Sequence, residues 1–162
     1  MGNTIIKSSI IIILYFFALA LSFFLISLPF GIYSEIMVKL NEGGLEAMHL
    51  VVGAMNMLYF IGYLVVIIML IQIIDSTNNS PFIYKNVKRF RVMGVFLTIN
   101  AVYECIRGYG DNKFAGIQIL SNGNGAISPL MMIGIISALM CFVLAEVFKK
   151  AVEIKNDNDL TI

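Results

Sequence analysis

The long stretches without a charged residue constrain this chain more than any other feature. No Asp, Glu, Lys or Arg occurs at positions 8–34, 47–74 or 114–145. A helix that crosses a membrane needs about 20 consecutive apolar residues, and each stretch is long enough. Only 13% of the 162 residues are charged and the mean hydropathy is +0.90, whereas a soluble domain carries about 25% charge. We therefore predict an integral membrane protein in contact with a lipid bilayer.

A fourth apolar segment, shorter than the others, completes the predicted architecture. We expect an all-α fold, a four-helix transmembrane bundle forming a single domain over residues 1–162, with a polar connection at 33–46. Pro29 is expected to kink or end the first helix. The predicted spans are 9–31, 47–74, 92–109 and 128–148.

A signal peptide is the competing interpretation of the first segment, because Lys7 provides a basic start. The apolar run continues to Phe30, however, and the core of a signal peptide is usually only about 7–15 residues long. We therefore expect the segment to be retained as a helix.

The segment 92–109 is the only one with opposite charges in its interior. Asn100, Glu104 and Arg107 follow i, i+4, i+7 spacing, which Asp111 continues, so they form a stripe on one helix face. Such a stripe must face protein or water rather than lipid. Asn56 of the second segment is expected at a similar depth, where it would hydrogen-bond to this helix.

Three hypotheses remain open for the two charges in this stripe. Glu104 and Arg107 are i, i+3 neighbours that can form a structural ion pair, with Arg107 snorkelling outward. They can instead line an outward-facing cavity that takes a ligand. In the third hypothesis, Glu104 is the proton-coupled carboxylate of a small transporter or channel-like protein that works within a homodimer.

The connection at 75–91 combines turn residues with basic residues. Ser80-Pro81 is typical of an N-cap followed by Pro at the first helical position. Ile83, Val87 and Phe90 recur at helical spacing, which predicts an amphipathic lead-in to the third helix at the membrane surface. Its basic residues indicate either simple anchoring or a lipid or partner site. They are Lys85, Lys88, Arg89 and Arg91.

Ser128-Pro129 predicts the start of the last helix. Small residues recur along it at 4-3-4 spacing, and small residues let membrane helices approach closely. We expect them to form its packing face, with a dimer seam as the alternative. Beyond position 148 the helix is expected to continue into water to Lys155, and an acidic tail at 156–162 is expected to end it. The small residues are Gly134, Ala138, Cys141 and Ala145.

The distribution of Lys and Arg predicts the orientation. Lys39, Lys113 and Arg107 fall on one side of the predicted spans, and a larger basic group falls on the other. Because basic residues concentrate in the cytoplasm, both termini and the connection at 75–91 are expected there. The cytoplasmic group comprises Lys7, Lys85, Lys88, Arg89, Arg91, Lys149, Lys150 and Lys155.

No pattern in the chain predicts an enzyme, a metal site or a cofactor. His49 is the only histidine, which argues against a His-based metal site. Cys105 and Cys141 form no CxxC pair and are expected to stay unpaired. The glycines at 108, 110, 123 and 125 lack the strand–helix context of a nucleotide-binding loop. The net charge of +1 gives no electrostatic basis for direct nucleic-acid binding.

Two stretches carry a family resemblance. One reads Pro81-Phe82 followed by Asn86-Val87-Lys88-Arg89-Phe90-Arg91 and Gly94, and the other reads Ala145-Glu146-Val147-Phe148-Lys149-Lys150 with the closing Asp159-Leu160-Thr161-Ile162. With four spans in these positions, the whole chain resembles a bacterial membrane family named domain of unknown function 2975. Members more often have glutamates where this chain has Asn156-Asp157-Asn158. The resemblance implies a multi-pass protein of the bacterial inner membrane without an assigned activity, often encoded beside a small helix-turn-helix regulator.

These observations lead to one functional hypothesis and one alternative. The chain is expected to act as a membrane-bound binding or sensing partner of a cytoplasmic helix-turn-helix transcriptional regulator. Its tail is expected to fold back on the basic connection and build a cytoplasmic platform. The alternative is the transporter that uses Glu104. The platform comprises Lys85, Lys88, Arg89, Arg91, Glu146, Asp157 and Asp159.

Overall fold

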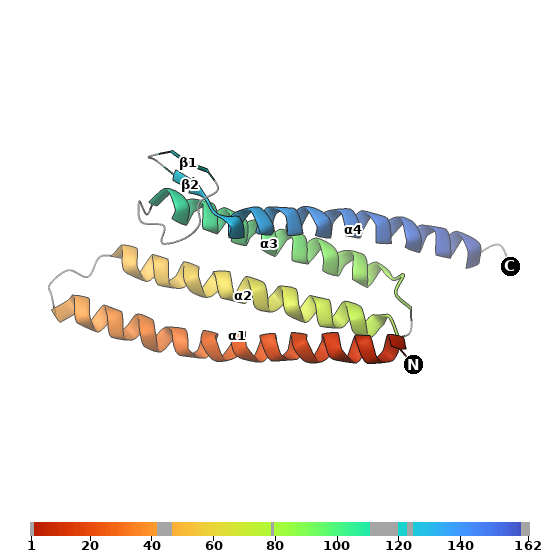
Figure 1. Cartoon of the computed structure of the whole chain (residues 1–162), viewed down its shortest axis with the longest axis horizontal. Coiled ribbons are helices and arrows are strands. Elements are labelled where there is room, and N and C mark those ends of the chain that lie inside the picture. Colours follow the sequence, from red (N-terminus) through yellow and green to blue (C-terminus); the bar gives the residue numbers. More distant parts are fainter. Residues whose placement is uncertain (1, 42–46, 79, 111–119, 123–124, 160–162) are drawn as a thin grey trace. The chain divides into compact units, whose positions relative to one another are not determined.

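The predicted all-α fold with four long helices is confirmed (Figure 1). The computed structural model describes residues 2–41, 47–78, 80–110, 120–122 and 125–159. Between α3 and α4, the short strands β1 and β2 pair antiparallel, with Leu120 opposite Ile127. The elements are α1 (Gly2–Asn41), α2 (Ala47–Ser76), α3 (Tyr84–Gly110), β1 (Leu120–Asn122), β2 (Gly125–Ile127) and α4 (Pro129–Asp159).

Three of the helices are long and apolar enough to cross a membrane, which supports the prediction of a membrane protein. The three segments are Ile5–Val38, Val51–Ser76 and Pro129–Asn158. Within the described part of the chain, α3 does not reach the same apolar character, because its first turns are basic and Glu104 and Arg107 lie near its end. By length and apolar character alone, α3 is therefore not among the candidate membrane spans.

The chain divides into two compact units, and the first is Met1–Ile67. Here α1 and the first part of α2 pack antiparallel. The rings of Phe24 and Phe60 lie 4.8 Å apart between centroids. Nearer the other end, a methyl group built on Gly53 would lie 3.2 Å from the Ile32 side chain. Gly53 therefore marks a close approach of the two helices.

The second unit, Ile68–Ile162, is built on an antiparallel pairing of α3 with α4. At one end of the pair, a methyl group built on Gly134 would lie 3.2 Å from the Ala101 side chain. At the other end, the rings of Phe90 and Phe148 lie 5.0 Å apart. The seam residues alternate at three- and four-residue spacing, as in coiled coils. The buried ones are Val87, Phe90, Gly94, Leu97 and Ala101 in α3, and Gly134, Ala138, Cys141, Ala145 and Val152 in α4.

The helix boundaries differ from the prediction at the end of α1. The helix includes Pro29 and continues to Asn41, where we predicted a polar connection from position 33. Proline costs one backbone hydrogen bond, but the next residues include the good helix formers Glu35, Met37 and Lys39. The helix ends where the turn sequence Asn41-Glu42-Gly43-Gly44 begins, and the last three of these residues lie outside the described ranges.

The start of α3 also differs, because Ser80 does not cap it and the helix begins at Tyr84. The Ser80 N–H instead donates to the Ser76 carbonyl at 3.1 Å, and the Asn86 N–H donates to the Ile83 carbonyl at 2.9 Å. The predicted lead-in is one continuous helix with the rest of α3. Its apolar face, with Val87 and Phe90, is buried within the protein rather than left open to a membrane surface.

The end of α4 corrects the predicted tail. The helix continues to Asp159, although we expected it to stop at 156 and the tail to fold back. Asn and Asp are weak helix formers rather than helix breakers, and no Gly or Pro occurs after position 134. Residues 149–159 therefore extend the helix and do not turn back over α3.

Candidate functional site

The turn between α2 and α3 is organised by one completely buried amide. Asn86 is 0% exposed. Its Nδ2 donates to Ser76 Oγ at 2.7 Å and to the Pro81 carbonyl at 2.8 Å. Buried polar groups are costly unless they are hydrogen-bonded, so this amide specifies the path of the turn.

Arg89 extends this network back to α2. Its Nε donates to Gln72 Oε1 at 3.0 Å, and its Nη1 donates to the Gln72 carbonyl at 3.1 Å and to Asn86 Oδ1 at 2.7 Å. Hydrogen bonds from an ionised donor are about twice as strong as neutral ones. The guanidinium therefore ties the last turn of α2 to the first turns of α3.

The end of α4 docks against the same turn. The Phe148 ring contacts those of Phe82 and Phe90, at centroid distances of 5.8 Å and 5.0 Å. One turn later Val152 is only 2% exposed, and Lys155 Nζ donates to Ser80 Oγ at 3.0 Å. Residues 72–91 and 146–159 thus form one packed region, referred to below as the docked end.

The docked end contains all of the residues predicted for the platform, but they differ in role. Lys85, Lys88 and Arg91 are exposed, whereas Arg89 is committed to the internal network. Lys149 Nζ lies 3.9 Å from carboxylate oxygens of both Glu146 and Glu153. Surface pairs of this kind contribute about 0–1 kcal/mol. Asp157 is exposed on the helix, and nothing is described of the Asp159 side chain.

Within the described part of the predicted polar stripe, Glu104 and Arg107 do not form an ion pair. Asn100 is 2% exposed, Glu104 is half-buried and Arg107 is exposed. Among the described residues, no salt bridge joins Glu104 to Arg107; the guanidinium instead lies 5.9 Å from the centroid of the Tyr103 ring. Asp111 lies outside the described residues, and the hydrogen bond expected from half-buried Asn56 stays a prediction.

The small residues of α4 lie in the seam with α3, and all four are buried. The Ala101 side chain approaches Gly134 closely enough that only glycine fits there without displacement. Cys105 and Cys141 are both free cysteines. No group of three metal-binding side chains occurs within the described ranges.

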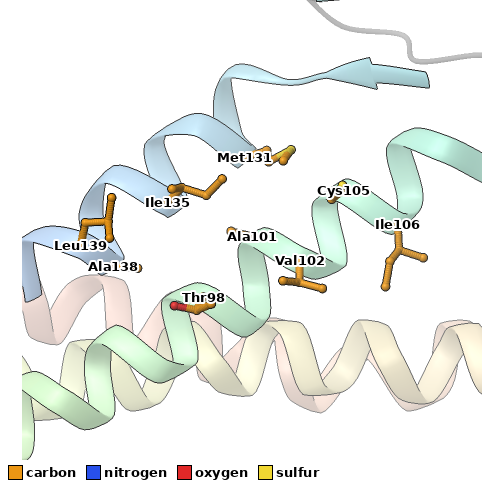
Figure 2. Close-up of a pocket in the computed structure, with 9 residues that line it drawn as sticks. All are labelled: Thr98, Ala101, Val102, Cys105, Ile106, Met131, Ile135, Ala138 and Leu139. Atoms are coloured by element: carbon orange, nitrogen blue, oxygen red, sulfur yellow. The ribbon is translucent and has the colours of Figure 1, made fainter. Parts of the chain in front are cut away.

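An apolar groove of about 350 Å³ runs along the seam (Figure 2). Glu104 is absent from its lining. The Thr98 hydroxyl, which does line it, already donates to the Gly94 carbonyl at 2.8 Å. The Cys105 thiol in the lining is only a weak hydrogen-bonding group, so the groove suits a hydrocarbon. Its walls are Thr98, Ala101, Val102, Cys105 and Ile106 of α3, and Met131, Ile135, Ala138 and Leu139 of α4.

Sequence reasoning missed the roles of Gln72, Asn86 and Phe148. Asn86 and Phe148 occur in the stretches that carry the family resemblance, but spacing alone reveals neither the hydrogen bonds of Asn86 nor the packing of Phe148 against Phe82 and Phe90. It also missed Ile154, an apolar side chain that is 62% exposed beyond the predicted end of the last span. The available signal was that the apolar seam pattern of α4 ends at Val152, so that Ile154 falls outside it.

The model of the family described as "Protein of unknown function (DUF2975)" matches residues 4–162, which is nearly the whole chain. No curated protein and no solved structure matches the chain.

Proposed function

The chain belongs to the DUF2975 family of proteins of unknown function, and we propose that it is a four-span membrane protein whose docked end binds a cytoplasmic helix-turn-helix transcriptional regulator. The single observation that carries the proposal is the structure of the docked end. This end is an internally bonded region that presents exposed basic side chains and the exposed Ile154. The family resemblance suggests the class of partner.

Packing against α4 supports a membrane crossing by α3. The contacts between these antiparallel helices extend from Ala101–Gly134 to Phe90–Phe148. Because α4 is apolar enough to span a membrane, a helix paired with it over this length lies at the same depths. The exposed side chains of α3 support the same conclusion, since Val95, Ile99, Val102 and Ile106 form an apolar strip.

The positive-inside rule then orients the protein. With four spans, the N-terminus, the turn between α2 and α3, and the end of α4 share one side of the membrane. Most of the Lys and Arg residues belong to these three segments, and basic residues flanking spans concentrate in the cytoplasm. The docked end thus faces the cytoplasm of a bacterial inner membrane, where a DNA-binding protein is accessible.

The surface of the docked end suits a protein partner. Ile154 lies near the exposed Lys150 along α4, and Lys88 and Arg91 are exposed on α3. Interfaces commonly combine a few apolar anchors with a polar and charged rim. Because Asn86 and Arg89 fix the underlying turn, the free-energy cost of ordering this surface on binding is small.

Capture from native membranes tests this function. The tagged protein is purified in mild detergent, and co-purifying proteins are identified by mass spectrometry. The wild type is expected to retain a helix-turn-helix protein, and Ile154→Asp is expected to lose about tenfold or more of it. Asn156→Asp is the matched control, since it adds the same charge two residues away on an exposed position. Equal capture by both variants, or no DNA-binding protein, would contradict the proposal.

One further variant separates this function from transport. Glu104→Gln removes the charge that a proton-coupled carrier requires, yet Glu104 is no part of the docked end. We expect its capture of the regulator to equal that of the wild type, whereas Lys88→Glu should weaken capture. The opposite pattern, with an intact fold, would favour the intramembrane site.

A further inference from the structure

The groove between α3 and α4 is bordered by exposed side chains of α3. Val102 is 53% exposed, and its neighbours Thr98 and Ile106 are exposed as well. Figure 2 shows the side chains of both helices bordering the groove. The residues between it and the start of α3 that share this exposed side are Val95, Arg91 and Lys88.

The size of the groove selects its occupant. An α-helix with its side chains is about 10–12 Å in diameter, so even two turns would overfill a volume of about 350 Å³. A single hydrocarbon chain fits it. The polar side-chain groups of the lining are the Thr98 hydroxyl, which donates within its own helix, and the Cys105 thiol, which is only a weak hydrogen-bonding group, so the lining favours a hydrocarbon over a polar ligand.

The positive charges of Arg91 and Lys88 near one end of the groove favour an anionic lipid headgroup. At about 1.5 Å rise per residue, Arg91 lies roughly 10 Å along α3 from Thr98, 16 Å from Val102 and 22 Å from Ile106. One leaflet of a bilayer core is about 15 Å thick. A lipid whose headgroup lies beside Arg91 and Lys88 therefore extends an acyl chain into the half of the groove between Thr98 and Val102.

We propose that the groove holds one acyl chain of an anionic phospholipid whose headgroup is bound by Lys88 and Arg91. This inference rests on the proposed crossing of α3 but not on the regulator. Lys88 and Arg91 belong to the docked end, so a lipid held here would occupy part of its exposed basic surface. Bilayer composition would then be able to influence the surface offered to the partner.

Quenching by brominated lipids tests the proposal, because the chain contains no tryptophan. Val102→Trp places a reporter in the groove. Ile133→Trp is the control, since Ile133 is 60% exposed, is absent from the groove lining and adjoins Gly134, which packs against Ala101 at the same depth. Each variant is reconstituted in vesicles of equal phosphatidylglycerol and phosphatidylcholine, with bromine on the chains of one lipid or the other.

At Val102→Trp, we expect an apparent preference of about fivefold or more for phosphatidylglycerol, and at Ile133→Trp a preference near one. Adding Lys88→Gln and Arg91→Gln should remove the preference at position 102. Equal preferences at both positions, or a preference that survives the added changes, would overturn the proposal. Quenching at position 133 without any at 102 would also overturn it, since protein would then cover the groove. A loss of regulator capture alone would leave these lipid results unchanged.

Discussion

Asn86 and Arg89 determine how three segments of the chain meet. The Asn86 amide bonds to Ser76, to Pro81 and to Arg89, and Arg89 reaches on to Gln72. Both residues occur in a run that reads as a basic membrane anchor. The structure is needed to distinguish Arg89, which is part of the hydrogen-bond network, from Lys88, which is exposed.

Replacing Asn86 with alanine tests this role. The change removes three hydrogen bonds, one of them to a charged donor, so we expect the free energy of unfolding to fall by about 2–4 kcal/mol. Reversible unfolding in mixed detergent micelles measures the change. Asn156→Ala removes an exposed amide and is expected to alter stability by less than about 0.5 kcal/mol. Similar values for both variants would show that the buried network contributes little.

Two glycines in the seam are expected to respond differently to alanine. At Gly134 the new methyl group would lie 3.2 Å from the Ala101 side chain, which cannot move without its helix. At Gly94 it would meet the Phe142 ring at 2.8 Å, but that side chain is partly exposed and can rotate away. We expect Gly134→Ala to destabilise the protein by about 1–3 kcal/mol. Gly94→Ala should be neutral or stabilising by up to about 1 kcal/mol. The same unfolding assay separates them, and a reversed order would contradict the seam.

At the scale of the helices, sequence predicted the elements better than their ends. Charge-free runs located α1, α2 and α4, and the small-residue spacing in α4 coincides with its buried face. The helix boundaries depend on a balance between competing local interactions, which sequence patterns do not reveal. Helix formers after Pro29 outweighed the lost hydrogen bond, and Ser80 bonds to Lys155 instead of capping α3.

Docking of α4 against the start of α3 is expected to depend on Phe148. Truncating this half-buried ring to alanine removes contacts with Phe82 and Phe90. We expect a loss of about 2 kcal/mol, which corresponds to roughly 30-fold faster amide exchange over residues 84–91. Hydrogen exchange with mass spectrometry measures this rate. Val147→Ala, which changes an exposed neighbour, should leave these amides protected; equal acceleration by both variants would contradict the docking.

At the scale of the whole chain, α3 is the element whose position matters most. Its hydropathy alone would leave three spans, with the two termini on opposite sides of the membrane. Its pairing with α4 and its exposed apolar strip argue for four spans, which bring both termini to one side. Sequence patterns predicted four segments. The packing of α3 against α4, which supports placing the charged helix α3 in the membrane, involves residues distant in sequence, such as Ala101 and Gly134.

The most direct test is a set of reporter fusions after Asn41, Ser80, Gly110 and Ile162. Green fluorescent protein reports a cytoplasmic fusion point, and alkaline phosphatase reports an external one. Four spans with both termini in the cytoplasm predict external reporters after Asn41 and Gly110, and cytoplasmic reporters after Ser80 and Ile162. If the reporters after Ser80 and Gly110 lie on the same side and the one after Ile162 is external, α3 does not cross. The end of α4 would then be out of reach of a cytoplasmic regulator, which would contradict both the four-span topology and the proposed function.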